Sequence, residues 1–356
     1  MDYSKYYTPT AIAHLLVKHL QISPPDKIVD ICCGSCNLLM VAKKRWHNAV
    51  LYGSDIAEHS VDGVIFEKTD GRAYALNHQN EFELVLANPP FDYLETKKEY
   101  PQLFQGAFEN YSSSRLEIEM LISNLIMLKE DGTLLIIMPS SFVEGETYST
   151  IRQILSKHYQ IKDIIELDES TFGAAQIHSY AIVIKNKICK NYLCNLMYAR
   201  RQGDAFDLIF KKKISSKILL KGVWDGLECE DRNLPLDIKR GNISSASFRE
   251  SGQPILHTAK NEAIWYPSVR YIDEKLISNV YAERGDIVVS RIGKSAGQWC
   301  VYSGERIPIS DCLFRIKDSD GKIFQKINGK RYDLKSRGVA TQYITMSDFN
   351  RWISSL

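Results

Sequence analysis

Asn88, Pro89, Pro90 and Phe91 form the part of the sequence best suited to chemistry, and they directly follow an apolar run at residues 83–87. Each proline fixes its φ angle and lacks a backbone N–H, so the loop is stiff and its carbonyl groups have set directions. Asn88 then offers an amide oxygen from a rigid position at the end of a strand. A simple turn explains one proline, but an asparagine, two prolines and an aromatic residue together are uncommon. This loop is therefore a candidate for a binding or catalytic site.

Three aspartates lie at the ends of three successive expected strands. Asp30 opens the stretch 30–38, which reads Asp-Ile-Cys-Cys-Gly-Ser-Cys-Asn-Leu and joins a strand to a helix. Backbone N–H groups and a helix N-terminus face a bound ligand at such a turn. Asp55 ends the second strand, where a carboxylate can accept both hydroxyls of a ribose, and Asp70 follows the third, where it can accept an adenine amine. Each aspartate alone is more often a cap or turn residue, but the three together are more informative.

Alternating strands and helices must position these residues. The expected strands are 27–31, 50–55, 63–68, 82–87, 133–138, 161–167 and 179–185, and the expected helices are 10–20, 38–46, 117–128 and 148–158. This alternation predicts an α/β domain with a mostly parallel sheet that helices cover on both faces. A ligand is then expected at the carboxyl ends of the strands.

The second part of the chain has a different pattern and a different charge. After about residue 186, short β-branched and aromatic runs alternate with turn residues, which predicts a β-rich α+β domain whose clearest strand is 286–290, followed by 300–302 and 313–316. Residues 1–199 carry 18 Lys and Arg and 24 Asp and Glu, a net charge of −6, whereas residues 200–356 carry 27 and 19, a net charge of +8. We therefore expect two domains, 1–199 and 200–356, of which the second meets a polyanion. A solvated charged surface explains the charge equally well.

Composition excludes several other classes. The chain has 356 residues, of which 44% are hydrophobic and 25% charged, and its apolar runs are far shorter than the roughly 20 residues that a membrane span needs. The first ten residues do not resemble a secretory signal, so we expect a cytoplasmic protein without a membrane partner. Of eight cysteines, three cluster in the turn at 32–36 and the others are scattered, which favours reduced thiols over a disulfide framework. Cys33 and Cys36 form a single CxxC without a second ligand pair, so no metal is expected.

The motifs of the first domain resemble those of the gamma-order N6-adenine DNA methyltransferases of type I and type II restriction-modification systems. The resemblance rests on residues 30–38, Asp55, Asp70 and 88–91 in that order, with Tyr7-Thr8-Pro9 before them and Ser170-Thr171-Phe172 after them, and it covers about residues 1–186. It implies a Rossmann-like domain that uses S-adenosylmethionine to methylate an adenine flipped out of the duplex. The implied catalytic residues are Asn88, Pro89, Pro90, Phe91 and Phe172.

The same resemblance assigns residues to the cofactor, namely Tyr7, Thr8, Asp30, Cys32, Cys33, Gly34, Asp55, Ile56, Asp70 and Asn88. It implies that Asp55 holds the ribose hydroxyls and Asp70 the adenine amine, while Thr8 and residues 32–34 face the methionine end. Cys36 is a departure, because the family usually has glycine at this position. If the backbone there needs a positive φ, the side chain costs about 1 kcal/mol or more, and we expect activity to survive.

The second domain resembles the target-recognition domains of type I restriction specificity subunits. The matching residues are 285–291, Gly293, Gly297, 310–311 and 338–349. Five basic residues are candidate contacts to DNA phosphates or bases, namely Lys239, Arg240, Arg270, Arg291 and Lys294.

These observations predict a site-specific DNA adenine-N6 methyltransferase of a restriction-modification system. We expect a monomer that binds double-stranded DNA, with a restriction endonuclease or another restriction-modification subunit as a candidate partner. Two alternatives remain open. One is a methyltransferase that acts on RNA or on a protein amide. The basic second domain argues against a protein substrate. The other is a catalytically silent DNA-binding specificity component, which the departure at Cys36 suggests.

Overall fold

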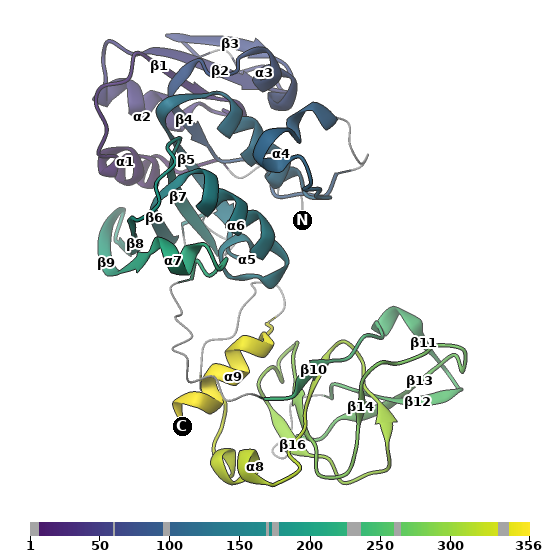
Figure 1. Ribbon diagram of the computed structural model, residues 1–356. Helices are drawn as coiled ribbons and strands as arrows, with labels where there is room; N and C mark the ends of the chain where they lie inside the picture. Colours follow the sequence, from purple (N-terminus) through teal and green to yellow (C-terminus); the bar gives the residue numbers. More distant parts are fainter. Residues whose placement is uncertain are drawn as a thin grey trace. The chain divides into compact units, whose positions relative to one another are not determined.

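The chain folds into two compact units, Met1–Glu228 and Cys229–Leu356 (Figure 1). The computed structural model describes residues 7–59, 61–94, 100–168, 171–172, 178–225, 236–259, 265–333 and 342–356. No helix among these residues is long and apolar enough to cross a membrane.

A nine-stranded sheet forms the first unit, in the order β3-β2-β1-β4-β5-β7-β6-β8-β9. The strands are β1 (Lys27–Asp30), β2 (Val50–Asp55), β3 (Val64–Lys68), β4 (Phe82–Ala87), β5 (Leu128–Pro139), β6 (Gln160–Leu167), β7 (Ser179–Lys185), β8 (Leu193–Gln202) and β9 (Ala205–Ser215). Strands β3, β2, β1, β4 and β5 pair in parallel, and β7 runs antiparallel between β5 and β6. The carboxyl ends of β1, β2 and β4 therefore lie at one edge of the sheet.

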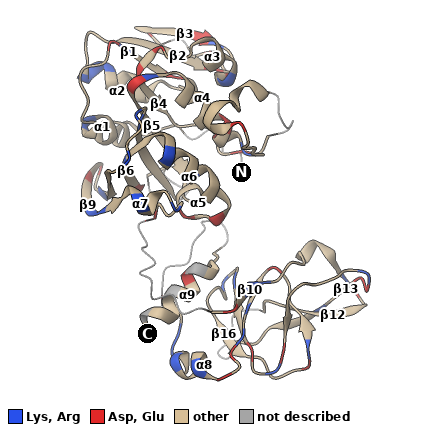
Figure 2. Ribbon diagram, in the orientation of Figure 1, with Lys and Arg blue, Asp and Glu red and all other residues tan. Residues whose placement is uncertain are grey.

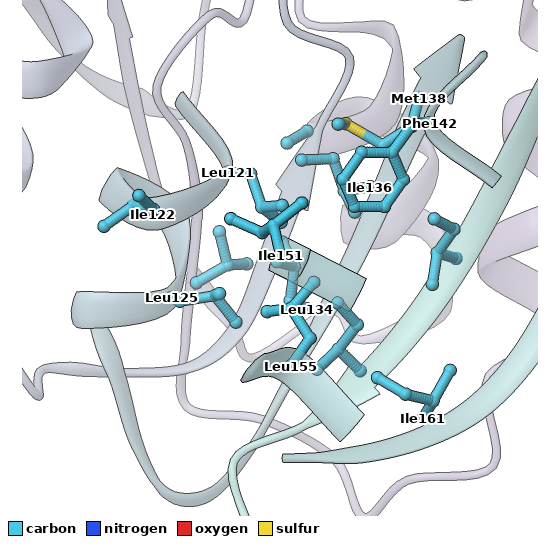
Figure 3. Close-up of a cluster of buried hydrophobic side chains, with 14 of the residues drawn as sticks. Leu121, Ile122, Leu125, Leu134, Ile136, Met138, Phe142, Ile151, Leu155 and Ile161 are labelled. Atoms are coloured by element: carbon cyan, nitrogen blue, oxygen red, sulfur yellow. The ribbon is translucent and has the colours of Figure 1, made fainter. Parts of the chain in front are cut away.

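Helices cover both faces of this sheet, as the sequence predicted. They are α1 (Thr10–His19), α2 (Asn37–Arg45), α3 (Gly71–Asn77), α4 (Leu116–Ile126), α5 (Ser140–Glu144), α6 (Ser149–His158) and α7 (Ser216–Leu219), with short 3-10 helices at Pro101–Leu103, Gly106–Phe108 and Glu146–Tyr148. Alternate residues of β5 point to opposite faces. Leu134 and Ile136 join a cluster with α4, α5 and α6 (Figure 3), whereas Leu135 and Ile137 join one with α1 and α2.

The boundary between the two units lies at residues 228 and 229, whereas the sequence led us to expect it near residue 200. The reason is the β8–β9 hairpin, because β8 pairs in parallel with β6 and extends the first sheet. With this boundary the first unit carries 25 basic and 28 acidic residues, a net charge of −3, and the second carries 20 and 15, a net charge of +5. The contrast in charge is smaller than expected because residues 200–228, with 7 basic and 4 acidic residues, belong to the first unit. Figure 2 shows both signs of charge on β9, which lies in this segment.

The described residues of the second unit are β-rich with two helices, which confirms the expected α+β class. Its strands are β10 (Ile238–Arg240), β11 (Phe248–Arg249), β12 (Gln253–His257), β13 (Ser268–Ile272), β14 (Tyr281–Ala282), β15 (Ile287–Ser290), β16 (Trp299–Val301), β17 (Ile307–Pro308) and β18 (Leu313–Ile316). Its helices are α8 (Lys322–Ile327) and α9 (Met346–Ser355), with a 3-10 helix at Ser245–Ser247. The three strands expected from the sequence, β15, β16 and β18, are neighbours in a sheet of the order β10-β18-β15-β16. Part of the motif at 338–349 lies outside the described residues.

Candidate functional site

A cavity of about 400 Å³ opens at the carboxyl ends of β1, β2 and β4. Every catalytic and cofactor residue expected from the sequence lines it, from Tyr7 to Phe172. Further residues line the cavity that were not expected from the sequence, namely Ile31, Ser35, Asn37, Leu38, Ala57, His59, Gly71, Arg72, Leu116 and Met120. Most of these are chain neighbours of expected residues. Leu116 and Met120 are four apart on α4, so the apolar face of that helix was the available signal.

The turn after β1 is held by its own hydrogen bonds. The amide of Cys32 donates to Asp30 Oδ1 (3.0 Å), that of Cys33 to the Ser54 carbonyl (3.1 Å) and that of Gly34 to Asp55 Oδ2 (2.9 Å). The amide of Cys36 donates to the carbonyl of Cys33 (2.7 Å). Because these amides are engaged, the turn is a poor cradle for a pyrophosphate. It suits a nucleoside cofactor that has no phosphate.

Cys36 has a left-handed backbone, with φ of 58° and ψ of 21°, directly before α2. The backbone at this position therefore does need a positive φ, and Cys36 carries the strain of a side chain in that conformation. Its side chain is fully buried in the cluster of α1 and α2. The strain thus lies behind the cavity, because Cys36 is not one of its lining residues.

The Asp55 carboxylate holds the neighbouring backbone by hydrogen bonds and can still accept further ones. Its Oδ2 accepts the Gly34 amide and its Oδ1 accepts the Ala57 amide (3.0 Å), which leaves further lone pairs on both oxygens. Ile56, next to it in the cavity wall, is 76% exposed. An apolar side chain this exposed in a concave wall is suited to cover a flat apolar group. The pair fits a ribose and an attached adenine.

Asp30 is buried at the base of the cavity, and burial raises its pKa from 3.8 to about 7. The amide of Cys32 opposes this rise, and the nearby negative charge of Asp55 adds to it. A carboxyl group in this state gains from a cationic ligand, because a positive charge favours its ionised form. S-adenosylmethionine, with its sulfonium and ammonium groups, is such a ligand.

Asp70 has a partner that the sequence did not reveal. Its side chain caps α3 by accepting the Arg72 amide (2.8 Å), and it also accepts Arg72 Nε (3.1 Å) and Nη2 (2.7 Å). Burial opposes ionisation, but the hydrogen bonds from Arg72 outweigh it and hold the pKa of Asp70 below its usual value. Arg72 also donates to buried Glu119 (2.7 Å). Asp70 is therefore an ionised, fixed acceptor whose main partner is Arg72.

The loop 88–91 begins directly after β4 ends at Ala87. Phe91 and Phe172 are half-buried, and both pack against the cluster of α1 and α2 while they line the cavity. Each ring is thus shared between core and cavity. Before Phe172, the amide of Thr171 donates to the carbonyl of Asp168 (2.8 Å), which holds the turn. Ser170, the first residue of that motif, lies outside the described residues.

In the second unit, Arg240 and Arg291 converge on Asp311. Both donate Nε to its carbonyl oxygen, at 3.0 and 2.8 Å. Burial and the neighbouring Arg240 charge lower the pKa of Arg291. Arg270 lies in a shallow groove with His257, whose pKa is lowered by burial and by Arg270. The other two candidates are exposed: Lys239 pairs with Asp237 at 3.9 Å, and Lys294 has no such pair among the described residues.

A mostly parallel α/β sheet with a nucleoside-sized cavity at its carboxyl edge, beside a rigid Asn-Pro-Pro-Phe loop, defines a class of nucleoside-cofactor enzymes. Residues 2–207 match the sequence model of the N-6 DNA methylases, and the chain belongs to this family.

The chain is also similar to individual proteins of restriction-modification systems, each over about half of its length. The type II restriction enzyme and methyltransferase RM.Eco57I of Escherichia coli is 27% identical over 187 residues, which are 49% of this chain and 17% of that protein. The modification methylase CviBIII of Paramecium bursaria Chlorella virus NC1A is 24% identical over 213 residues, which are 53% of each chain. The chain thus spans about half or less of the length of these relatives.

The solved structures to which the chain is similar include a type I restriction-modification methyltransferase subunit from Streptococcus thermophilus. The TM-score is 0.48, with 19% identity over 57% of this chain and 50% of that one. The type IIG restriction endonuclease BpuSI has a TM-score of 0.49 and 11% identity over 96% of this chain and 57% of that one.

Proposed function

We propose that the protein is a site-specific DNA adenine-N6 methyltransferase that uses S-adenosylmethionine and acts in a restriction-modification system. One observation carries the proposal: the loop 88–91 lines the same cavity as Asp30, Asp55 and Asp70. A platform for an acceptor amine and a site for a nucleoside cofactor therefore share one enclosed space. The membership of the N-6 DNA methylase family supports the same function.

The residues of the loop prepare the amine for transfer. Asn88 through its amide oxygen and Pro89 through its carbonyl accept the two hydrogens of the adenine N6 amine, which directs the nitrogen lone pair into the cavity. Phe91 and Phe172 stack on the two faces of the extruded base and recover part of the cost of unstacking it. S-adenosylmethionine, when bound, supplies an electrophilic methyl group. No strong base is needed, because the rate derives mainly from position and from fixed dipoles, and the methylated nitrogen, positively charged once it gains the methyl group, releases its extra proton to water.

Other residues of the cavity wall hold the cofactor. Asp55 accepts the ribose hydroxyls, Ile56 covers the adenine ring, and Asp70 accepts the adenine amine with the lone pair that Arg72 leaves. Tyr7, Thr8 and residues 32–34 face the methionine end, where Asp30 provides negative charge. Thr8 is itself fixed, because its carbonyl accepts Asn37 Nδ2 at 2.8 Å.

The partners follow from this activity. The substrate is double-stranded DNA, and the basic second unit reads the target sequence through Lys239, Arg240, Arg270, Arg291 and Lys294. A restriction endonuclease or another restriction-modification subunit is the expected protein partner, and the chain acts as a cytoplasmic monomer.

The test is methylation of plasmid DNA by the purified chain with labelled S-adenosylmethionine, followed by long-read mapping of modified adenines. We expect one recurring sequence context. The matched control is Asn88→Ala, which should abolish transfer yet leave cofactor affinity within about tenfold, because Asn88 acts on the acceptor. Label in RNA or protein, with none in DNA, would support the alternative acceptors. DNA binding without cofactor binding would support the silent component.

A further inference from the structure

A pair of residues outside the proposed catalytic and cofactor sites lies beside the wall of the cavity. Tyr93 and Arg115 form an antiparallel β-bridge. It is flanked by hydrogen bonds from the Leu94 amide to the Ser114 carbonyl (3.0 Å) and from the Leu116 amide to the Asp92 carbonyl (2.9 Å). The bridge joins two parts of the cavity wall, because Phe91 precedes Tyr93 by two residues and Leu116 directly follows Arg115.

The side chain of Tyr93 is exposed, and it is therefore accessible to a ligand. Its side chain is 68% exposed, and one face of its ring carries the Arg115 guanidinium, with the central carbon 4.2 Å from the ring centroid. A tyrosine that served packing would be largely buried. The ring instead acts as a support for the guanidinium plane, as aromatic rings do at sites that bind anions through arginine.

Arg115 is fixed from behind by a buried carboxylate. Its Nε donates to Glu117 Oε1 at 2.8 Å, and Glu117 is fully buried. The hydroxyl of Tyr148 donates to the same oxygen at 3.3 Å, while Oε2 of Glu117 is buried without a hydrogen-bond partner among the described residues. A buried carboxylate oxygen without a partner is costly in a fold, and the interaction of the other oxygen with Arg115 offsets part of that cost. The same interaction holds Arg115 in one place.

The contact with Glu117 uses only Nε, so the two Nη groups of Arg115 have no hydrogen bond in the described part of the chain. A planar guanidinium with two Nη groups available matches two oxygens of a phosphate. Because its position is set before binding, less conformational entropy is lost when an anion arrives. Arg115 thus offers a prepared phosphate site beside the cavity wall.

We propose that Arg115, supported by Tyr93 and Glu117, binds a backbone phosphate next to the adenine that enters the cavity. This inference rests on the proposed function, because it takes the ligand to be DNA. The strand that carries the extruded nucleotide must pass close to the cavity, and a phosphate contact beside the cavity wall fixes the strand without reading its sequence. Arg115 is a binding residue, and Glu117 a positioning residue that acts through it.

The experiment compares Arg115→Gln and Tyr93→Ala in the full chain with Lys187→Gln. Lys187 is a matched control, because it is an exposed cation in an ion pair with Asp131 (3.3 Å), just beyond the end of β7 at the opposite edge of the sheet. DNA affinity is measured over a range of salt concentrations, together with KM, kcat and cofactor affinity. Tyr93→Ala keeps the test valid should Arg115→Gln fold poorly, because the Tyr93 side chain is exposed.

Arg115→Gln should lower DNA affinity about tenfold or more and reduce the slope of log affinity against log salt by about one. Tyr93→Ala should weaken DNA binding in the same direction, and both variants should keep their cofactor affinity, while Lys187→Gln should match the parent in every measurement. An unchanged salt slope and KM for DNA in both variants, with the parent active on DNA, would overturn this inference alone. A parent chain that does not methylate DNA would instead overturn the proposed function.

Discussion

The ring of Tyr7 lies against Gly34, so that a Cβ added to Gly34 would come within 2.3 Å of Tyr7 Cε1. Gly34 also has a φ of 47°, in the left-handed region. The contact joins the segment before α1 to the turn after β1, and both residues line the cavity. The shape of the proposed methionine end therefore depends on the absence of a side chain at Gly34.

Gly34→Ala should consequently weaken S-adenosylmethionine binding about tenfold or more, because Tyr7 must leave its place. Backbone strain alone would cost about 1 kcal/mol. Gly63→Ala separates the two effects, since Gly63 has a φ of 81° but nothing within 4 Å of the added Cβ. Calorimetric titration of both variants is the measurement. Equal cofactor affinity in both would contradict a role for the contact.

Asp30 gives the protein a predicted pH dependence. Its pKa of about 7 means that it is largely protonated at pH 6 and largely ionised at pH 8. A cationic cofactor prefers the ionised form, so affinity for S-adenosylmethionine should rise with pH through about 7 and level off above it. Titrations between about pH 5.5 and 8.5 would test this. The rise should be absent in Asp30→Asn, and a rise that persists in this variant would assign it to another group.

The same group acts in the opposite sense on the stability of the protein without cofactor. The pKa of Asp30 is higher in the folded chain than the 3.8 of an unperturbed aspartate, so the folded chain binds this proton more tightly than the unfolded chain. Its contribution to the free energy of unfolding therefore falls as pH rises from about 4 to about 7, and the loss is complete above that range. Melting curves of the parent and Asp30→Asn should accordingly diverge with rising pH.

Much of the first unit could be predicted because its signals are local. The strands expected at 50–55, 82–87 and 179–185 coincide with β2, β4 and β7, since each is a short apolar run between turn residues. Once the strands are parallel, their carboxyl ends meet at one edge. The three aspartates and the loop 88–91 are then neighbours by topology alone, although they are far apart in the sequence.

The missed features depend on distant partners. β8 reads as an ordinary strand, and only its pairing with β6, where Asn195 Nδ2 donates to Asp163 Oδ1 at 2.7 Å, places it in the first sheet. Likewise, Arg72 is positioned by Glu119, which lies 47 residues further along the chain. Composition and periodicity describe a window of sequence, so they cannot identify partners at such separations.

The observed boundary predicts how the chain can be divided. A chain that ends after residue 225 should fold, bind S-adenosylmethionine and lack tight, salt-sensitive DNA binding. One that ends after residue 199 loses β9, which exposes the edge of β8 and its buried residues Cys194 and Leu196, so it should melt lower or aggregate. Thermal melts and cofactor titrations of both chains would decide. Equal stability would contradict the placement of the β8–β9 hairpin in the first unit.

Phe172 is half-buried, packs on the cluster of α1 and α2, and lines the cavity, so its two proposed roles can be separated. Phe172→Ala should reduce turnover severely because stacking contributes about 1 to 3 kcal/mol per base, whereas Phe172→Trp should retain much of the activity. Truncation of a fully buried phenylalanine costs about 3 to 5 kcal/mol of stability, and Phe142, which is 0% exposed, provides that reference as Phe142→Ala. Phe172→Ala should cost clearly less than this. The measurements are a thermal melt, a methylation assay and the fluorescence of 2-aminopurine at the target adenine. If Phe172→Ala melts as low as Phe142→Ala while Phe172→Trp is inactive, Phe172 belongs to the core, and another residue holds the extruded base.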